Sequence, residues 1–191
     1  MKATGITRKI DELGRIVIPK EIRRTLRIRE GTPLEIFTEK NGEIILRKYS
    51  PMGELVAFAG QYADSLAQTT GMQVCITDLE QVIAAAGGAK KEYLGKALSQ
   101  ELEHLMEERT QLQAQPEERK YVDVIKEMSG EKYHQTICPI ICQGDVFGAV
   151  ILLAKDGKTN MGETEKKLAY CAAGFLGRQM EEYDYDSGLI Q

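Results

Sequence analysis

Long apolar segments are absent from this sequence of 191 residues. It has no run of about eighteen apolar residues, the length that a helix needs in order to span a membrane. Its first residues, Met1 to Gly5, lack the apolar stretch of a signal peptide. We therefore expect a soluble protein that resides in the cytoplasm.

Cysteine is sparse, and its spacing does not indicate a disulfide framework. Reduced thiols are the simplest interpretation of Cys75, Cys138, Cys142 and Cys171. Because Cys138 and Cys142 lie four positions apart, a redox pair or half of a metal site is an alternative. Apolar residues surround this pair, so we favour a packing role.

Motifs for catalysis and metal binding are also missing. No Ser/His/Asp grouping, P-loop or paired metal ligands occur, so we predict no enzyme activity, no metal and no established cofactor. His104 lies among glutamates and is expected to be solvated, whereas His134 lies in a predicted strand and favours a structural role. The Gly87–Lys91 segment could hold an anion, but an ordinary strand-to-helix loop is the simpler interpretation.

Charge is distributed unevenly along the chain. Residues 1–50 contain 12 Lys/Arg and 7 Asp/Glu, a net charge of +5, whereas the whole chain has a net charge of −4. The remaining residues therefore carry −9. The difference in charge between the basic residues 1–50 and the acidic remainder indicates that only residues 1–50 bind a polyanion.

Residues 1–50 are predicted to form short strands around one short helix. Ile6–Ile10 alternates with a period of two, and Arg15–Ile18 is rich in β-branched residues. Pro19 can begin a helix that extends to Ile28, because the first turn of a helix does not need the N–H that proline lacks. Asn41-Gly42 predicts a hairpin turn between two further strands, Leu34–Thr38 and Glu43–Arg47.

A unit of this size is marginal by itself, so we expect two chains to share one core. Pairing would place two basic faces at a fixed spacing, as in symmetric proteins that read duplex DNA. Ile22 and Leu26 share one side of the predicted helix, and its basic residues lie on the other side. Arginine can bond phosphate or guanine with two parallel hydrogen bonds. The candidates for DNA contact are Arg23 and Arg24 on the helix and Arg8 and Arg15 beside the Ile10–Gly14 turn.

Ser50-Pro51 is the predicted boundary with a second domain, residues 53–182. We expect helices near 55–70, 91–98, 100–109 and 162–182, strands at 73–77, 81–86, 120–126, 133–141 and 146–153, and a loop at 111–119. This α/β layering with an antiparallel sheet is typical of folds that hold a small molecule between sheet and helices. Two apolar helix stripes, Leu55–Leu66 and Leu168–Met180, favour core packing and could also join these domains into a tetramer.

The segment from Thr4 to Arg24 closely resembles the AbrB-type swapped-hairpin DNA-binding family. Further stretches, Arg23–Gly31, Gly148–Val150, Thr159–Glu163 and Ala172–Met180, resemble a family of two-domain sporulation regulators of spore-forming bacilli. The resemblance implies an α+β protein: a swapped-hairpin β-barrel dimer formed by residues 1–50 and a GAF-like sensor domain over 53–182. It implies that Arg8, Arg15, Arg23 and Arg24 stand at DNA-contact positions. It also implies sequence-specific activation and repression of sporulation genes, with a possible unidentified ligand in the GAF-like domain.

Two other functions share part of this pattern. An antitoxin with the same DNA-binding fold would carry a disordered tail that wraps a toxin, and the folded character of the second half argues against it. A cysteine-dependent GAF-fold enzyme with a DNA-binding appendage would need a reactive thiol, such as that of Cys138.

Overall fold

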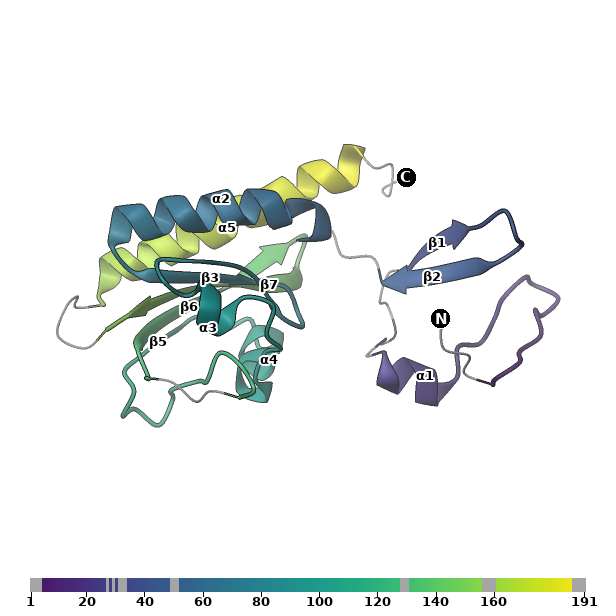
Figure 1. Ribbon diagram of the computed structural model, residues 1–191, viewed down its shortest axis with the longest axis horizontal. Helices are drawn as coiled ribbons and strands as arrows, with labels where there is room; N and C mark the ends of the chain where they lie inside the picture. Colours follow the sequence, from purple (N-terminus) through teal and green to yellow (C-terminus); the bar gives the residue numbers. More distant parts are fainter. Residues whose placement is uncertain are drawn as a thin grey trace. The chain divides into compact units, whose positions relative to one another are not determined.

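The computed structural model describes residues 5–26, 28, 30, 34–48, 52–127, 131–155 and 161–186. Internal contacts divide the chain into two compact units, Met1–Ser50 and Pro51–Gln191, and each unit is described by itself. Figure 1 shows the elements of both units. No helix within the described ranges is long and apolar enough to cross a membrane.

The first unit contains one helix and one hairpin. Helix α1 spans Lys20–Thr25 and follows Pro19, whose backbone is extended at φ −57° and ψ 147°. Strands β1 (Leu34–Thr38) and β2 (Ile44–Lys48) pair antiparallel. Gly42 adopts φ +85°, which favours glycine, and its N–H donates to the carbonyl of Glu39 at 3.0 Å. The predicted hairpin is confirmed.

Helix α1 is shorter than predicted, because it ends at Thr25 and not at Ile28. The N–H of Ile28 donates to the carbonyl of Arg23 at 2.7 Å. A bond that spans five residues in this way is the closing bond of a Schellman motif, which satisfies a carbonyl that the helix itself leaves open. The chain therefore turns out of the helix three residues early.

The strands predicted at Ile6–Ile10 and Arg15–Ile18 are not formed, and neither segment has a ladder partner among the described residues. Between them lies a turn, in which the N–H of Asp11 donates to the carbonyl of Arg15 at 3.0 Å. A strand exists only when a neighbour receives its backbone hydrogen bonds. The β-branched pattern therefore describes segments that have no such neighbour within one chain.

Most apolar side chains of the first unit are exposed. On one face of the hairpin, Ile36 and Ile44 are 66% and 63% exposed, and Val17 before the helix is 70% exposed. Ile36 and Leu46 are opposite each other in the ladder, so Ile36, Leu46 and Ile44 share that face, whereas Phe37 and Ile45 are paired on the other face. Other exposed apolar residues of this unit are Ile6, Ile10, Leu13, Ile16 and Leu26. The described part of this unit therefore has almost no apolar core within one chain.

The second unit is built on one antiparallel sheet of five strands in the order β4-β3-β7-β6-β5. Its helices are α2 (Met52–Thr70), α3 (Lys90–Tyr93), α4 (Gln100–Glu107) and α5 (Glu163–Asp186). Its strands are β3 (Gln73–Thr77), β4 (Val82–Ala86), β5 (Leu112–Ala114), β6 (His134–Cys142) and β7 (Asp145–Ala154). Helices α2 and α5 lie side by side over one face of the sheet (Figure 1).

Alternation along the strands produces two separate cores. Ile76, Ile140 and Leu152 pack with the buried residues of α2 and α5 on one face. Cys75, Ile137, Ile151 and Leu153 point to the other face, toward α3, α4 and the segment around residues 122–125. The two predicted stripes lie largely in the first core, where Phe58, Tyr62 and Phe175 form a cluster with ring centroids 5.3 to 6.4 Å apart.

The structure differs from the prediction for this unit at residues 94–98, 111–119 and 120–126. Residues 94–98 do not continue α3, because the segment runs beside β4: the N–H of Gly95 donates to the carbonyl of Val82 at 2.8 Å, and that of Val82 donates to Lys96. Residues 120–126 are not a strand of the sheet, since they bond instead to residues 97–99 and form one isolated bridge, Leu98 to Ile125. The edge strand is β5, within the predicted loop.

Gln135 is an anomaly in the second core. Its side chain is fully buried on β6 opposite Leu153, and among the described residues neither its amide nitrogen nor its amide oxygen has a hydrogen-bond partner. Burial of an unpaired amide costs free energy because the hydrogen bonds to water are lost without replacement.

We predict that Gln135→Leu raises the free energy of unfolding by about 1 kcal/mol, because it removes the unpaired amide from the core at similar volume. The same change at Gln113, whose amide nitrogen donates to Thr136 at 3.2 Å and to the carbonyl of Gly162 at 3.0 Å, should be destabilising. Urea denaturation at one protein concentration measures both. A less stable Gln135→Leu variant would show that this amide has a partner in solution.

Candidate functional site

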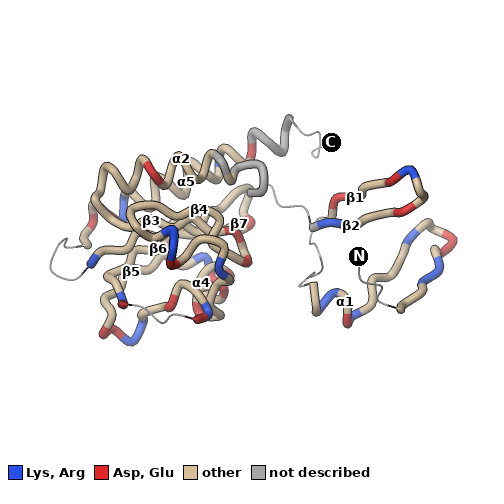
Figure 2. The backbone as a smooth tube through the Cα atoms, viewed as in Figure 1, with Lys and Arg blue, Asp and Glu red and all other residues tan. Residues whose placement is uncertain are grey.

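The four arginines predicted to contact DNA all lie in the first unit, and all four are exposed. Arg8 precedes the Asp11–Gly14 turn, Arg15 follows it, and Arg23 and Arg24 lie next to each other in α1. In Figure 2, Lys and Arg positions recur along α1 and the extended segment before it. None of the four arginines forms an ion pair with a described residue except Arg15, so guanidinium groups are available to an external anion.

Arg15 is positioned by Asp11. Its Nε donates to Oδ2 of Asp11 at 2.8 Å, and its backbone N–H donates to Oδ1 of the same carboxylate at 2.8 Å. These two hydrogen bonds, with a third from the N–H of Leu13, hold the pKa of Asp11 below its ordinary value. Because Asp11 stays ionised, it fixes the turn and the root of the Arg15 side chain together.

Sequence reasoning did not identify Asp11. The signal was present, since aspartate at the start of a turn that ends with glycine commonly accepts the N–H groups of the turn. Gly14 has φ +76°, and its N–H donates to the carbonyl of Asp11 at 2.9 Å. In the sequence analysis this carboxylate enters only the net charge, although it organises a basic residue.

The cysteines are placed for packing. Cys138 and Cys142 are both buried in the first core. Their Cα atoms are separated by about 13 Å along the strand, because each residue of an extended strand adds about 3.3 Å, and a disulfide needs less than about 7 Å. Burial raises the pKa of Cys138 to about 11 and raises that of Cys75 further still. Thiolates, the reactive form of cysteine, are therefore disfavoured at neutral pH.

The remaining candidates have ordinary surroundings. His104 is exposed on α4 and lies 3.4 Å from the carboxylate of Glu108. His134 begins β6 opposite Ala154. Gly87 lies so close to the carbonyl of Met72 that a Cβ atom there would stand 2.1 Å from its oxygen, which explains the glycine without a ligand. Within the described ranges, no group of three His, Cys, Asp or Glu residues could hold a metal ion.

Two protein families match different parts of the chain. Residues 7–54 match the family described as antidote-toxin recognition MazE, bacterial antitoxin. Residues 54–181 match the family described as stage V sporulation protein T C-terminal, transcription factor.

Two relatives and one solved structure extend these matches. The chain is 50% identical to stage V sporulation protein T (SpoVT) of Bacillus subtilis (strain 168) over 182 residues, which are 95% of this chain and 100% of that protein. It is 43% identical to the transition state regulatory protein AbrB of the same organism over 86 residues, 44% of this chain and 88% of that protein. The cofactor binding GAF domain of the nutrient sensor CodY from Clostridium difficile has 17% identity and a TM-score of 0.50, and the match covers 63% of this chain and 83% of that chain.

These matches confirm the predicted combination of an AbrB-like unit with a GAF-like unit. The similarity to the CodY domain shows only the fold of the second unit, because the identity is low. The SpoVT family match covers more than half of the chain, and the relative of that name aligns over its whole length. The chain therefore belongs to the stage V sporulation protein T family.

Proposed function

We propose that this chain is a sequence-specific DNA-binding transcription regulator that activates and represses sporulation genes from the cytoplasm. In this proposal residues 1–50 bind duplex DNA through Arg8, Arg15, Arg23 and Arg24, and residues 53–182 act as a sensor domain. The observation that carries the proposal is the set of four exposed arginines in a unit of net charge +5. Such a surface attracts the phosphate backbone, and arginine also reads guanine in the major groove.

A shared core completes the DNA-binding surface. The exposed apolar face of the hairpin, with Ile36, Ile44 and Leu46, and the unpaired segments around the Asp11–Gly14 turn each need a partner. A second copy of the same unit supplies both, because its extended segments can pair with these and its apolar face can cover this one. The dimer places two sets of arginines at one spacing, which suits two half-sites on duplex DNA.

A second contact between chains would join two such dimers into a tetramer. The α2–α5 layer of the second unit leaves Tyr170 63% exposed and Val56 41% exposed, on the side away from the sheet. Exposed aromatic residues are enriched where proteins associate. Since α2 follows directly after residues 1–50 in the chain, contact through this layer would set the spacing of the basic units.

The match to an antitoxin family favours a second candidate function over residues 7–54. In an antitoxin, the segment after the DNA-binding unit wraps a toxin as it folds. Here that segment is a five-stranded sheet with two cores of its own. A folded unit with both faces of its sheet covered offers no extended chain to a toxin, so regulation is the better proposal.

Arg23→Ala and Arg24→Ala should each weaken binding to duplex DNA while the fold is retained, because neither side chain is buried. An arginine that reads a base should cost about 1–3 kcal/mol and relax sequence preference, whereas one that contacts phosphate should reduce the salt slope by about one. Fluorescence anisotropy over a salt series distinguishes the two roles. Lys40→Ala, which removes the same charge from the hairpin turn, serves as the control, and equal effects in all three variants would contradict the assignment.

Ile36→Asp should halve the assembly and abolish DNA binding if the hairpin face lies in a shared core, since a buried carboxylate without a partner is costly. In a monomeric unit the same change would be harmless, because Ile36 is exposed. Asn41→Asp adds the same charge at the turn and keeps the acceptor for the N–H of Glu43, so it is the matched control. Sedimentation of the full chain measures the size, and an unchanged assembly would refute the shared core.

Thiol labelling at neutral pH tests the cysteine-dependent enzyme. In the native protein only Cys171 should react, because it is exposed whereas Cys75, Cys138 and Cys142 are buried. The raised pKa of Cys138, about 11, means that its reaction rate should increase only as the pH rises well above the ordinary thiol range. Mass spectrometry of the labelled peptides gives the result, and rapid modification of Cys138 at pH 7 would favour the enzyme.

A further inference from the structure

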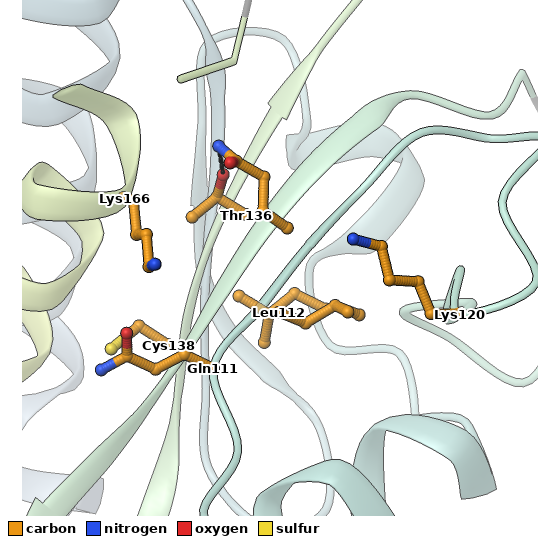
Figure 3. A pocket seen from close by; sticks show the side chains of 8 residues that line it. Gln111, Leu112, Lys120, Thr136, Cys138 and Lys166 are labelled. Atoms are coloured by element: carbon orange, nitrogen blue, oxygen red, sulfur yellow. Dashed lines mark hydrogen bonds between the residues drawn. The ribbon is translucent and has the colours of Figure 1, made fainter. Parts of the chain in front are cut away.

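A pocket of about 250 Å³ lies at one edge of the sheet, between β5, β6 and the first turns of α5 (Figure 3). Its lining residues are Gln111, Leu112, Gln113, Lys120, Thr136, Ile137, Cys138 and Lys166. The pocket lies at the small end of ligand sites, which are commonly about 300–1,000 Å³, so its occupant is small. The pocket belongs to the second unit, whereas the four arginines belong to the first. None of the functions described above involves this pocket.

The charge of the lining is of one sign. Lys120 and Lys166 are its only charged residues, and no carboxylate is among the eight residues. In Figure 3 the two lysine side chains come from opposite sides of Leu112, and both ammonium groups point toward the space between them. Two positive charges at one small pocket favour an anion between them.

The acidic partners of these lysines lie outside the pocket. Nζ of Lys120 is 3.1 Å from a carboxylate oxygen of Glu118, and Nζ of Lys166 is 3.8 Å from that of Glu163. The four side chains are between 41% and 75% exposed, and exposed ion pairs contribute little stability. An incoming anion therefore competes with weak interactions.

The polar groups between the lysines are held in place. Nε2 of Gln113 donates to the hydroxyl of Thr136 at 3.2 Å and to the carbonyl of Gly162 at 3.0 Å. The N–H of Gly162 donates in turn to Glu165 at 2.7 Å. This network connects the edge strand β5 to the start of α5 at the pocket wall.

We propose that this pocket binds a small organic dicarboxylate, with one carboxylate at Lys166 and the other at Lys120. Lysine ammonium groups at two ends fit an anion whose charges are separated by a short carbon chain. Phosphate sites instead gather backbone N–H groups, arginine forks or a lysine around one centre, whereas the two lysines of this lining come from two different elements. The proposal rests on the proposed sensor role of the second unit and names the ligand class of that sensor.

Binding there would also provide a route to the first unit. A ligand held by Lys166 on α5 and Lys120 after β5 would fix the first turns of α5 against the sheet. Helix α5 packs on α2 through Phe175 and Tyr62, whose ring centroids are 5.3 Å apart. Helix α2 follows residues 1–50 in the chain. A shift of α5 would therefore move α2, the helix to which the basic unit is connected.

Succinate is the probe, titrated into the full chain without DNA by isothermal calorimetry and by thermal unfolding. Saturable binding should raise the unfolding temperature, as for any ligand that binds only the folded state. Lys166→Ala and Lys120→Ala should each weaken binding by about tenfold or more, because each removes a charged hydrogen bond. Lys167→Ala and Lys126→Ala, which remove the same charge from exposed neighbours outside the pocket, should leave it unchanged.

Acetate and inorganic phosphate are the comparison ligands, and both should bind more weakly than succinate. The proposal is overturned if succinate does not saturate, if Lys166→Ala and Lys167→Ala bind alike, or if phosphate binds better. DNA affinity is measured separately on the same preparations. Loss of succinate binding with intact DNA binding would refute the pocket alone, and the reverse would refute the proposed DNA-binding function alone.

Discussion

Burial of the apolar side chains of the first unit is the constraint on which the DNA-binding arrangement depends. One chain leaves Ile10, Val17 and Ile36 more than half exposed, because so few residues cannot enclose a core. The segments on either side of the Asp11–Gly14 turn also have no ladder partner in the part of the chain that the structure describes. Association would therefore fix where Arg8 and Arg15 lie, whereas Arg23 and Arg24 already lie on a helix that its own hydrogen bonds close. In this arrangement DNA binding and dimer formation cannot be separated.

Sequence patterns predicted the elements whose hydrogen bonds are local. The hairpin around Gly42 and the helices before Gly71 and after Gly162 follow from turn chemistry and from apolar periodicity, and both signals lie within the element itself. The errors lie where a partner distant in sequence decides. Residues 94–98 run beside β4, and residues 120–126 form hydrogen bonds with residues 97–99. The sequence of neither segment indicates which residues it pairs with. The same reason applies to the segments before α1, whose proposed partner is another chain.

The candidate site was predicted less completely than the fold. The four arginines were found by their charge, their position on a helix or beside a turn, and a family resemblance, and the structure adds that all are exposed. Asp11 was missed because only its negative charge was considered, and not its capacity to accept hydrogen bonds from the turn and from Arg15. The lysines of the pocket, Lys120 and Lys166, were missed because 46 positions separate them in sequence and only the packing of α5 against the β5–β6 edge brings them to one pocket.

The two proposed anion sites are kept apart by charge and by size. The second unit carries a net charge of −9, so its surface repels duplex DNA and leaves the polyanion to the basic unit. Its two pocket lysines are flanked by Glu118 and Glu163, which a small dicarboxylate can displace and a DNA backbone cannot approach. A pocket of about 250 Å³ also excludes a duplex by its dimensions. In this proposal the first unit binds DNA and the second responds to a metabolite-sized anion without competition between them, which a sensor coupled to a DNA-binding unit requires.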